Sequence, residues 1–421
     1  MLTPNIKFTL IILLFSSPIF PQWTLQNYDT NYVFVDIDFI NDNTGIAVGF
    51  HYTNPYTYKG AIYKTTNAGL NWNIVFIDTN FIIYTIHFIN STDWLAAGGL
   101  YSTQPKMLKT TNSGNNWFYI NTGEITSRIH SIVFFNNVSY VTGAYGIYKS
   151  TNGGLNWTRL LMAGGDYANG YFLNALTGWS AFDDGIYKTS NGGVNWIRYI
   201  YNAYAHQITF TNQNTGYVIY DSLLYPPYYT KIFKTTNAGD NWILLNTWQK
   251  RHFWSLDFIN ENTGFVVGNE GIILKTTNAG NSWFESMPAG QIYNLIHVNF
   301  LNANTGYTCG SKGVILKTTN GGVFGITPIS NEVPSKFSLS QNYPNPFNPR
   351  TVIKFQVASS SSIKIIVFDI LGREVQTLVN EQLKPGTYEV DFVGSNFASG
   401  IYFYKLEAGE YVETRKMVLM K

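Results

Sequence analysis

The chain has 421 residues, of which 17% are aromatic and 12% charged, and its formal net charge is +2. So small a charge gives no reason to expect a nucleic-acid or anionic-membrane partner. The single cysteine, Cys309, excludes a disulfide within the chain, and we expect it to be a buried thiol because no His or Asp motif accompanies it.

Residues 1–21 have the layout of a secretory signal peptide. Lys7 precedes an apolar run over residues 8–15, and SSPIFP follows. The run is too short to span a bilayer, and no later segment is a transmembrane candidate. We therefore expect export, with cleavage near residues 17–22.

An eight-residue phrase, TTNAGLNW in its first copy, returns seven times. The copies end at Trp72, Trp117, Trp157, Trp196, Trp242, Trp283 and Phe324, at intervals of 45, 40, 39, 46, 41 and 41 residues. Each period also contains a hairpin phrase such as FINDNTGIAVG (39–49) and a strand such as ILKTT. Four short strands in a period of about 40–45 residues are typical of a β-propeller blade.

Trp23, in QWTLQN, resembles the strand that follows each copy of the phrase. Counting from Trp23 to Phe324 gives seven intervals, and a strand at the N-terminal end would complete the last blade. Closing the ring in this way removes exposed sheet edges. We predict an all-β chain whose residues 22–324 form a seven-bladed propeller.

The turn inside the phrase explains why the phrase recurs. An Asn side chain can bond the backbone two residues on, Gly supplies a positive φ, the preceding Thr hydroxyl can bond the turn, and the Trp covers it. We expect these residues to stabilise the fold: Asn67, Gly69, Trp72, Asn112, Gly114, Trp117, Asn152, Gly154, Trp157, Asn191, Gly193, Trp196, Asn237, Gly239, Trp242, Asn278, Gly280 and Trp283.

With Asn in the Asp position, the phrase resembles the Asp-box or BNR repeat. That repeat is found in sialidases, sortilin-type receptors and the propellers of photosystem II assembly factors. The resemblance implies that the phrase forms the turn between the third and fourth strands of each blade.

The repeat ends at Phe324, and residues 325–336, with Pro328 and Pro334, read as a linker. Period-2 strands separated by LGR, KPG and AGE turns then predict a small Ig-like β-sandwich over residues 337–421. Its segments YPNPFNP (343–349), FDILGREV (368–375), PGTYEVDF (385–392), SGIYFYKL (399–406) and the C-terminal 416–421 resemble the type A sorting domain of type IX secretion. The resemblance implies recognition by the outer-membrane export machinery and delivery from the periplasm to the cell surface or the medium.

The connections between the second and third strands of the predicted blades vary in length, and all of them lie on one face of the propeller. They are short at 268–271 and 310–313 but long at 50–61, 99–106 and 221–231, and the long ones are rich in tyrosine. Variable loops on a rigid scaffold often carry function, although these tyrosines can equally serve to pack their own loops. The candidate ligand-binding residues are Tyr56, Tyr58, Tyr101, Tyr228, Tyr229, Arg128, Asp166, Arg251 and Trp254.

The residues at the mouth of the central channel can be predicted by counting back along the inner strand of each blade from the Phe near its end. This places Tyr84, His130, His206, Trp254 and Ile296 at one level, and Arg128, Asp166, Tyr204, His252 and Asn294 at the next. A metal bound by His130, His206 and His252 is conceivable, but no close ligand spacing supports it, so we expect neither metal nor cofactor.

Two function classes remain. A glycoside hydrolase of the Asp-box type needs paired carboxyl groups, for which Asp166, Asp183, Asp184, Asp221 and Glu270 are candidates without a pairing spacing. A sialidase needs a cluster of arginines. Arg159 and Arg198 do not provide one, because they follow box tryptophans on outer strands. We favour a non-catalytic binding or scaffold module for a glycan or protein ligand, with no catalytic residues.

Overall fold

The computed structural model describes most of the chain. The described residues are 23–54, 57–100, 103–163, 165, 168–201, 204–222, 229–287, 290–322, 327–330, 332–394 and 397–420. The predicted signal peptide, residues 1–21, lies outside them.

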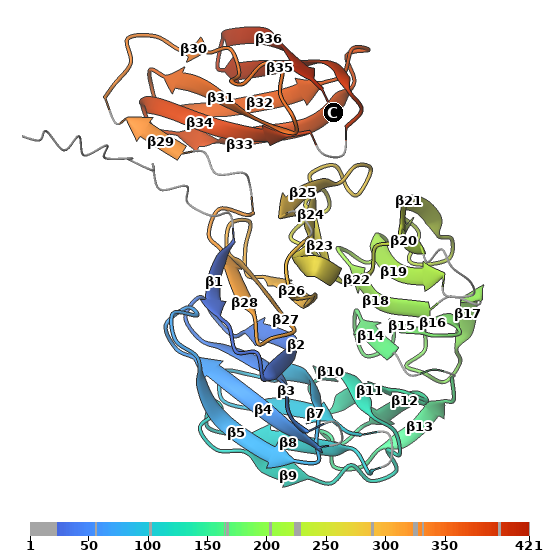
Figure 1. Cartoon of the computed structure of the whole chain (residues 1–421). Coiled ribbons are helices and arrows are strands. Elements are labelled where there is room, and N and C mark those ends of the chain that lie inside the picture. The colour runs from blue at the N-terminus through green and yellow to red at the C-terminus, as the bar shows by residue number, and fades with distance from the viewer. Residues whose placement is uncertain are drawn as a thin grey trace, which may run out of the picture.

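Seven four-stranded antiparallel sheets form the propeller (Figure 1). Blade 1 is β2 (Tyr32–Phe39), β3 (Gly45–Asn54), β4 (Thr57–Thr65) and β5 (Asn73–Thr79). Blade 2 is β6 (Ile83–Phe88), β7 (Trp94–Gly98), β8 (Lys106–Thr110) and β9 (Phe118–Ile120). Blade 3 is β10 (Ile129–Phe135), β11 (Val138–Gly143), β12 (Gly146–Ser150) and β13 (Thr158–Leu161).

Blade 4 is β14 (Ala168–Phe172), β15 (Gly178–Phe182), β16 (Gly185–Thr189) and β17 (Ile197–Tyr201). Blade 5 is β18 (Tyr204–Phe210), β19 (Gly216–Ser222), β20 (Tyr229–Thr235) and β21 (Ile243–Gln249). Blade 6 is β22 (Phe253–Phe258), β23 (Gly264–Gly268), the 3₁₀ turn η1 (Asn269–Gly271), β24 (Ile273–Thr276) and β25 (Phe284–Met287). Blade 7 is β26 (Leu295–Phe300), β27 (Gly306–Gly310), β28 (Ile315–Thr318) and β1 (Thr24–Asn27).

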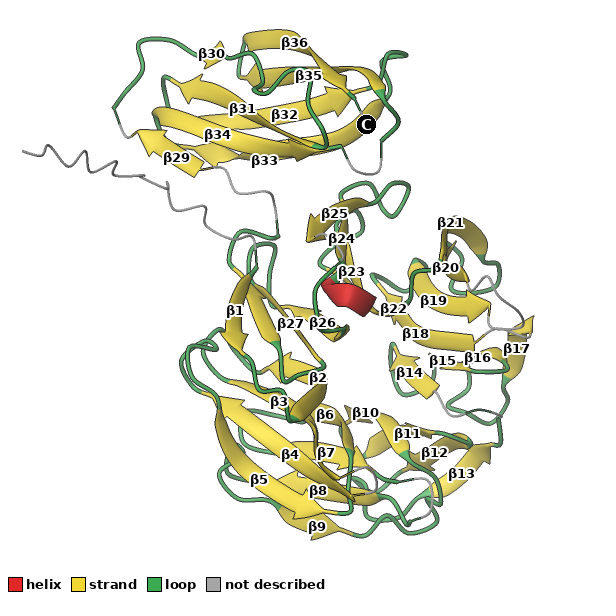
Figure 2. Ribbon diagram, viewed as in Figure 1, coloured by secondary structure: helices red, strands yellow, loops and turns green. Residues whose placement is uncertain are grey.

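The ring is closed by a strand from the N-terminal part of the chain, as predicted. β1 pairs with β28, so blade 7 combines residues from both ends of the repeat region. Each inner strand contacts the inner strand of the next blade, and β26 contacts β2 to complete the circle. Figure 2 shows that this region is almost entirely strand and loop.

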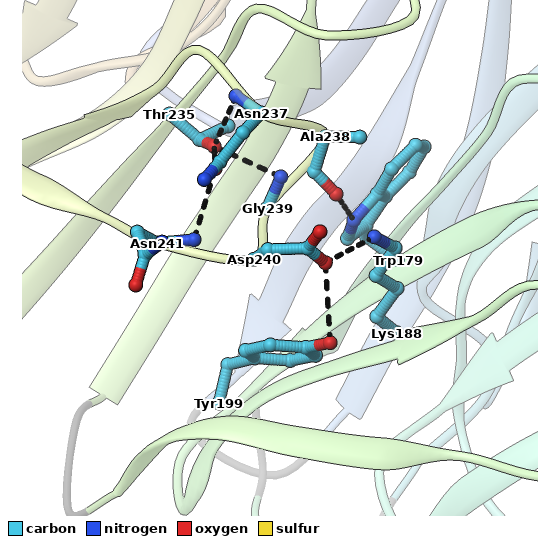
Figure 3. Close-up of polar contacts among 9 residues, drawn as sticks. All are labelled: Trp179, Lys188, Tyr199, Thr235, Asn237, Ala238, Gly239, Asp240 and Asn241. Carbon is cyan, nitrogen blue, oxygen red and sulfur yellow. Dashed lines mark hydrogen bonds and ion pairs between the residues drawn. The ribbon is translucent and has the colours of Figure 1, made fainter.

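The turn inside each copy of the repeated phrase, called the box turn below, is held by its own side chains. In blade 5 the Thr235 hydroxyl accepts the Gly239 N–H at 2.9 Å, and Asn237 Oδ1 accepts the Asn241 N–H at 2.9 Å (Figure 3). The Asn side chain therefore bonds four residues on, not the two we expected, because Gly239, at a φ of +84°, reverses the chain between them.

Neighbouring blades meet at the same turns. Trp179 of blade 4 donates its indole N–H to Ala238 of blade 5, and Lys188 pairs with Asp240 at 2.6 Å (Figure 3). Phe210 of blade 5 stacks on Trp179 with ring centroids 3.8 Å apart. Each box turn also donates a backbone N–H to the hairpin turn of its own blade, so both kinds of turn lie on one face of the disc.

One of the three long connections is shorter than predicted. β3 and β4 continue into it and pair as far as Asn54 with Thr57, because the alternating side chains of 50–61 suit a strand as well as a loop. Tyr58 therefore lies within β4, opposite Tyr52.

The C-terminal domain is a β-sandwich, as predicted, of two four-stranded sheets. One contains β29 (Thr327–Ser330), β34 (Gly386–Val393), β31 (Arg350–Val357) and β30 (Ser338–Leu339). The other contains β33 (Glu374–Leu383), β32 (Ser361–Phe368), β35 (Gly400–Ala408) and β36 (Tyr411–Leu419). The predicted linker 325–336 thus contributes a strand. Pro328 fits there because β29 is an edge strand, where a missing backbone N–H is tolerated.

Within the part of the chain that the structure describes, no helix has the length and apolarity that a membrane crossing requires.

Candidate functional site

A cavity of about 530 Å³ lies among the inner strands of the propeller. Six of these strands contain a β-bulge, where one residue has no partner on the second strand. The bulged residues are Val35, Tyr84, His130, His206, Trp254 and Ile296, and all six line the cavity. A bulge bends its strand and redirects a side chain, which makes it a common device beside binding sites.

The structure brings together in the cavity lining the five residues predicted at the first channel level, Tyr84, His130, His206, Trp254 and Ile296. It does not place Arg128, Tyr204, His252 or Asn294 in the lining, because the bulges interrupt the period-2 alternation on which that second level was counted. Asp166, the remaining member of that level, lies outside the described residues.

One position of the inner strands links neighbouring blades. Side chains at this position accept a backbone N–H from the next inner strand in five places, namely Asp36 from Ile86, Ser131 from Gly170, Asn169 from Ile208, Gln207 from Leu256 and Ser255 from Val298. In all of these but Asn169 the side chain directly follows a bulged residue. All but Ser255 also line the cavity. Sequence reasoning missed this set, although each member stands three residues before an inner-strand Phe and is polar.

Carboxyl groups form one wall of the cavity. Asp36 accepts the Ile86 N–H at 2.9 Å and pairs with His297 at 3.3 Å, while Asp38 accepts the Phe39 N–H and an Asn299 N–H. Burial, together with the nearby charges of Asp36 and Asp257, raises the pKa of Asp38 to about 7. Burial also raises the pKa of Asp257.

Asp38→Asn is expected to stabilise the protein at pH 8 but not at pH 4. The folded state keeps a proton on Asp38 that the unfolded chain releases above its ordinary pKa of 3.8, so stability falls as the pH rises toward 7. Removing the charge should recover about 1–2 kcal/mol at pH 8, which raises the melting temperature by a few degrees. Thermal melts at both pH values measure the effect.

Asn299→Asp is the matched control, because it adds a carboxyl group beside Asp38. It should lower the melting temperature at pH 8. An Asp38→Asn variant that melts lower than the parent at pH 8 would show that the carboxylate is stabilising.

Two of the three histidines considered for a metal share a carboxylate instead. His206 Nε2 and His252 Nδ1 each lie 2.9 Å from Asp221 Oδ2, and the Asp221 side chain is buried. Burial alone would raise the pKa of Asp221, but the bonds to His206, Thr230 and His252 outweigh it and leave that pKa lowered. His130 instead packs against Tyr84, with ring centroids 4.7 Å apart. Among the described residues no group of His, Cys, Asp and Glu is arranged to hold a metal.

A profile of the family described as photosynthesis system II assembly factor YCF48 matches residues 70–223 and 234–339, which is more than half of the chain. The chain belongs to this family. A second profile, described as a secretion system C-terminal sorting domain, matches residues 341–420.

Solved structures show the same fold as this YCF48-family chain. "YCF48 bound to D1 peptide" is 18% identical and has a TM-score of 0.57, covering 71% of this chain and 97% of that one. YCF48 from Cyanidioschyzon merolae is 16% identical, with a TM-score of 0.56 and coverages of 70% and 98%. A GH74 xyloglucanase from Xanthomonas campestris is 9% identical, with a TM-score of 0.55 and coverages of 80% and 59%. No curated protein matches.

The sorting domain directs this YCF48-family protein through type IX secretion to the cell surface or the medium. Its partner in that step is the secretion machinery. The sorting domain does not specify what the propeller binds after export.

The predicted arginines lie away from the cavity lining. Arg251 forms an ion pair with Glu285 of blade 6 at 3.2 Å, and Arg128 is buried in the segment before β10, where its carbonyl accepts the Ala144 N–H. Trp254, by contrast, lines the cavity and donates its indole N–H to Asn269 at 2.7 Å. Arg128 and Arg251 as ligand-binding residues therefore stay a prediction.

The predicted tyrosines are only partly described. Tyr56, Tyr101 and Tyr228 lie outside the described residues. Tyr58 packs near Phe50 and Tyr52, and Tyr229 pairs with Gln249 in the sheet of blade 5.

None of the described hydrolase candidates of the YCF48-family propeller lines the cavity. Asp184 accepts the Tyr187 hydroxyl and pairs with Arg198 on the outer part of blade 4, Asp221 lies between two histidines, and Glu270 is exposed in η1. The two carboxyl groups that do line the cavity, Asp36 and Asp38, both come from β2, whereas a glycosidase pair flanks the bond from two sides.

Proposed function

We propose that the exported propeller is a non-catalytic binding module that holds a glycan or protein ligand at the channel mouth. The observation that carries the proposal is that six inner strands each direct a bulged residue into one cavity. A concave site with aromatic walls and a few placed polar groups is the usual form of a ligand site.

The surroundings of the cavity support binding over hydrolysis. Asp36 accepts the Ile86 N–H of the next blade and lies 3.3 Å from the His297 ring, so it takes part in the contacts between blades. A member of the family has been solved with a peptide, as "YCF48 bound to D1 peptide", and this keeps a protein segment among the ligands to test.

The test is an incubation of the purified chain with glycan and peptide arrays, scored for both binding and hydrolysis. Binding without turnover is the expected result. Turnover that is lost on changing Asp183, Asp184 or Glu270 would establish the hydrolase instead.

Replacing Tyr56, Tyr101 and Tyr228 together by Ala is expected to abolish binding. Aromatic side chains often supply most of the binding energy of a ligand site, whereas surface substitutions usually change folding by no more than about 0.5 kcal/mol each. The array and a thermal melt measure the two effects. A variant that keeps its ligand but melts many degrees lower would show that the tyrosines pack their loops.

A further inference from the structure

We infer that the channel cavity takes an uncharged sugar residue, with the carboxamide nitrogens of Asn169 and Gln207 donating to its oxygens and Asp36 and Asp38 accepting from its hydroxyl groups. The inference rests on the proposed function and narrows its ligand class. Both sets of side chains line the same cavity of about 530 Å³, which lies within the usual size range of small-ligand sites.

The donor wall is fixed by the contacts between blades. Asn169 Oδ1 accepts the Ile208 N–H at 3.3 Å, and Gln207 Oε1 accepts the Leu256 N–H at 2.7 Å. Because the oxygen of each amide is held, its nitrogen is held too. Neither nitrogen has a hydrogen-bond partner among the residues that the structure describes, and both side chains are partly exposed in the lining. The cavity therefore presents two preorganised N–H donors from adjacent blades.

Blade 1 supplies hydrogen-bond acceptors to the cavity. Asp36 accepts one backbone N–H and pairs with His297, and Asp38 accepts one backbone and one amide N–H. A carboxylate has about four lone-pair sites, so each group keeps acceptor capacity. The hydroxyl groups of a sugar ring both accept and donate hydrogen bonds. A sugar can therefore bond to the amide donors and to the carboxyl acceptors at the same time.

The charges favour an uncharged ligand. No Lys or Arg is among the described residues that line the cavity, so an anion would face Asp36 without a cation to balance it. A cation would meet the His297 ring 3.3 Å from Asp36, and burial with the nearby charges of Asp36 and Asp257 raises the pKa of Asp38 to about 7, which weakens its negative charge near neutrality.

Aromatic side chains complete the fit. Trp254 and Tyr84 line the cavity from blades 6 and 2. The Trp254 ring is fixed by the bond from its indole N–H to Asn269 and by edge contact with His206, whose ring centroid is 5.1 Å away. A rigid apolar ring beside hydrogen-bonding groups can cover the C–H face of a sugar while the polar walls take its hydroxyl groups.

The test uses Asn169→Asp and Gln207→Glu in the full chain. Each variant keeps the oxygen that accepts the backbone N–H and replaces only the nitrogen that faces the cavity. Asn174→Asp is the matched control, because it makes the same change in blade 4 at a hairpin turn where Asn174 Oδ1 accepts the Leu176 and Thr177 N–H groups. Binding to immobilised neutral, uronic-acid-containing and amino-sugar oligosaccharides is measured alongside thermal melts.

We expect the parent and Asn174→Asp to bind neutral oligosaccharides equally, and each cavity variant to bind them about tenfold more weakly or worse, since a donor is lost and an acceptor faces the ligand oxygen. Unchanged binding by both cavity variants at unchanged melting temperature would overturn the inference. Binding of acidic sugars, amines or peptides alone would overturn it while leaving the proposed function standing. Binding of no array ligand would overturn both.

Discussion

Deletion of residues 22–30 is expected to destabilise the whole propeller, because this segment closes the ring. β1 is the outer strand of blade 7 and pairs with β28 through Thr24 opposite Lys317 and Leu25 opposite Leu316. Without it, β28 becomes an exposed edge and blade 7 keeps three strands.

Trp23, directly before β1, is buried where the ring closes. It is 6% exposed, donates its indole N–H to Ser286 at 3.0 Å, and meets Phe300 edge-on at 5.9 Å. In blades 1 and 5 the box residues Trp72 and Trp242 meet the inner-strand Phe39 and Phe210 in the same way, so Trp23 occupies the box-Trp position of blade 7.

The deletion should lower the melting temperature by more than about 10 °C or yield aggregated protein, since truncating a buried Trp alone costs about 3–5 kcal/mol. Trp23→Ala should reproduce a large part of the loss. Leu25→Ala, two residues further along in β1 and 57% exposed, should change little. A deletion variant that melts like the parent would disprove the closure.

The architecture was predictable because its causes are local and repeated. The Thr-x-Asn-x-Gly turn recurs wherever a Thr hydroxyl and an Asn side chain hold a reversal, and the spacing of these turns gives the number of blades. Five of the six bulged residues at the channel, all but Val35, could be counted from the inner-strand Phe for the same reason.

The failures came from contacts between residues far apart in sequence. The polar role of Gln207 depends on the Leu256 N–H, 49 residues away. Arg128, Tyr204, His252 and Asn294 of the second channel level were misplaced because a bulge in β10, β18, β22 and β26 shifts the alternation of side chains. A sequence pattern of apolar and polar residues does not mark a bulge. β29 was missed because Pro328 suits an edge strand as well as a linker.

Removal of the sorting domain is expected to block export. Sorting segments that lie far apart in sequence meet in the sandwich. The N–H of Phe347 donates to Val418, the N–H of Met420 donates back to Phe347, and Asn345 accepts the Val418 N–H. Phe347, Met417 and Leu419 are buried in one core. The YPNPFNP segment and β36 therefore form one folded surface that the secretion machinery can recognise.

Truncation after Gly322 should leave a folded propeller that accumulates in the periplasm. This boundary also removes β29, which pairs with β34 and would lose its sheet if the chain were cut at Val333. Fractionation with immunodetection measures the amount in the periplasm, at the surface and in the medium, and a several-fold or greater loss outside the cell is expected. As the reciprocal control, residues 327–421 fused to an unrelated exported passenger should carry it to the surface. Truncated protein at normal surface levels would contradict the role of the sorting domain. Ile365→Asp changes the same buried core outside the sorting segments. Retention of this destabilised variant in the periplasm would show that the machinery reads the folded sandwich, not the terminal residues alone.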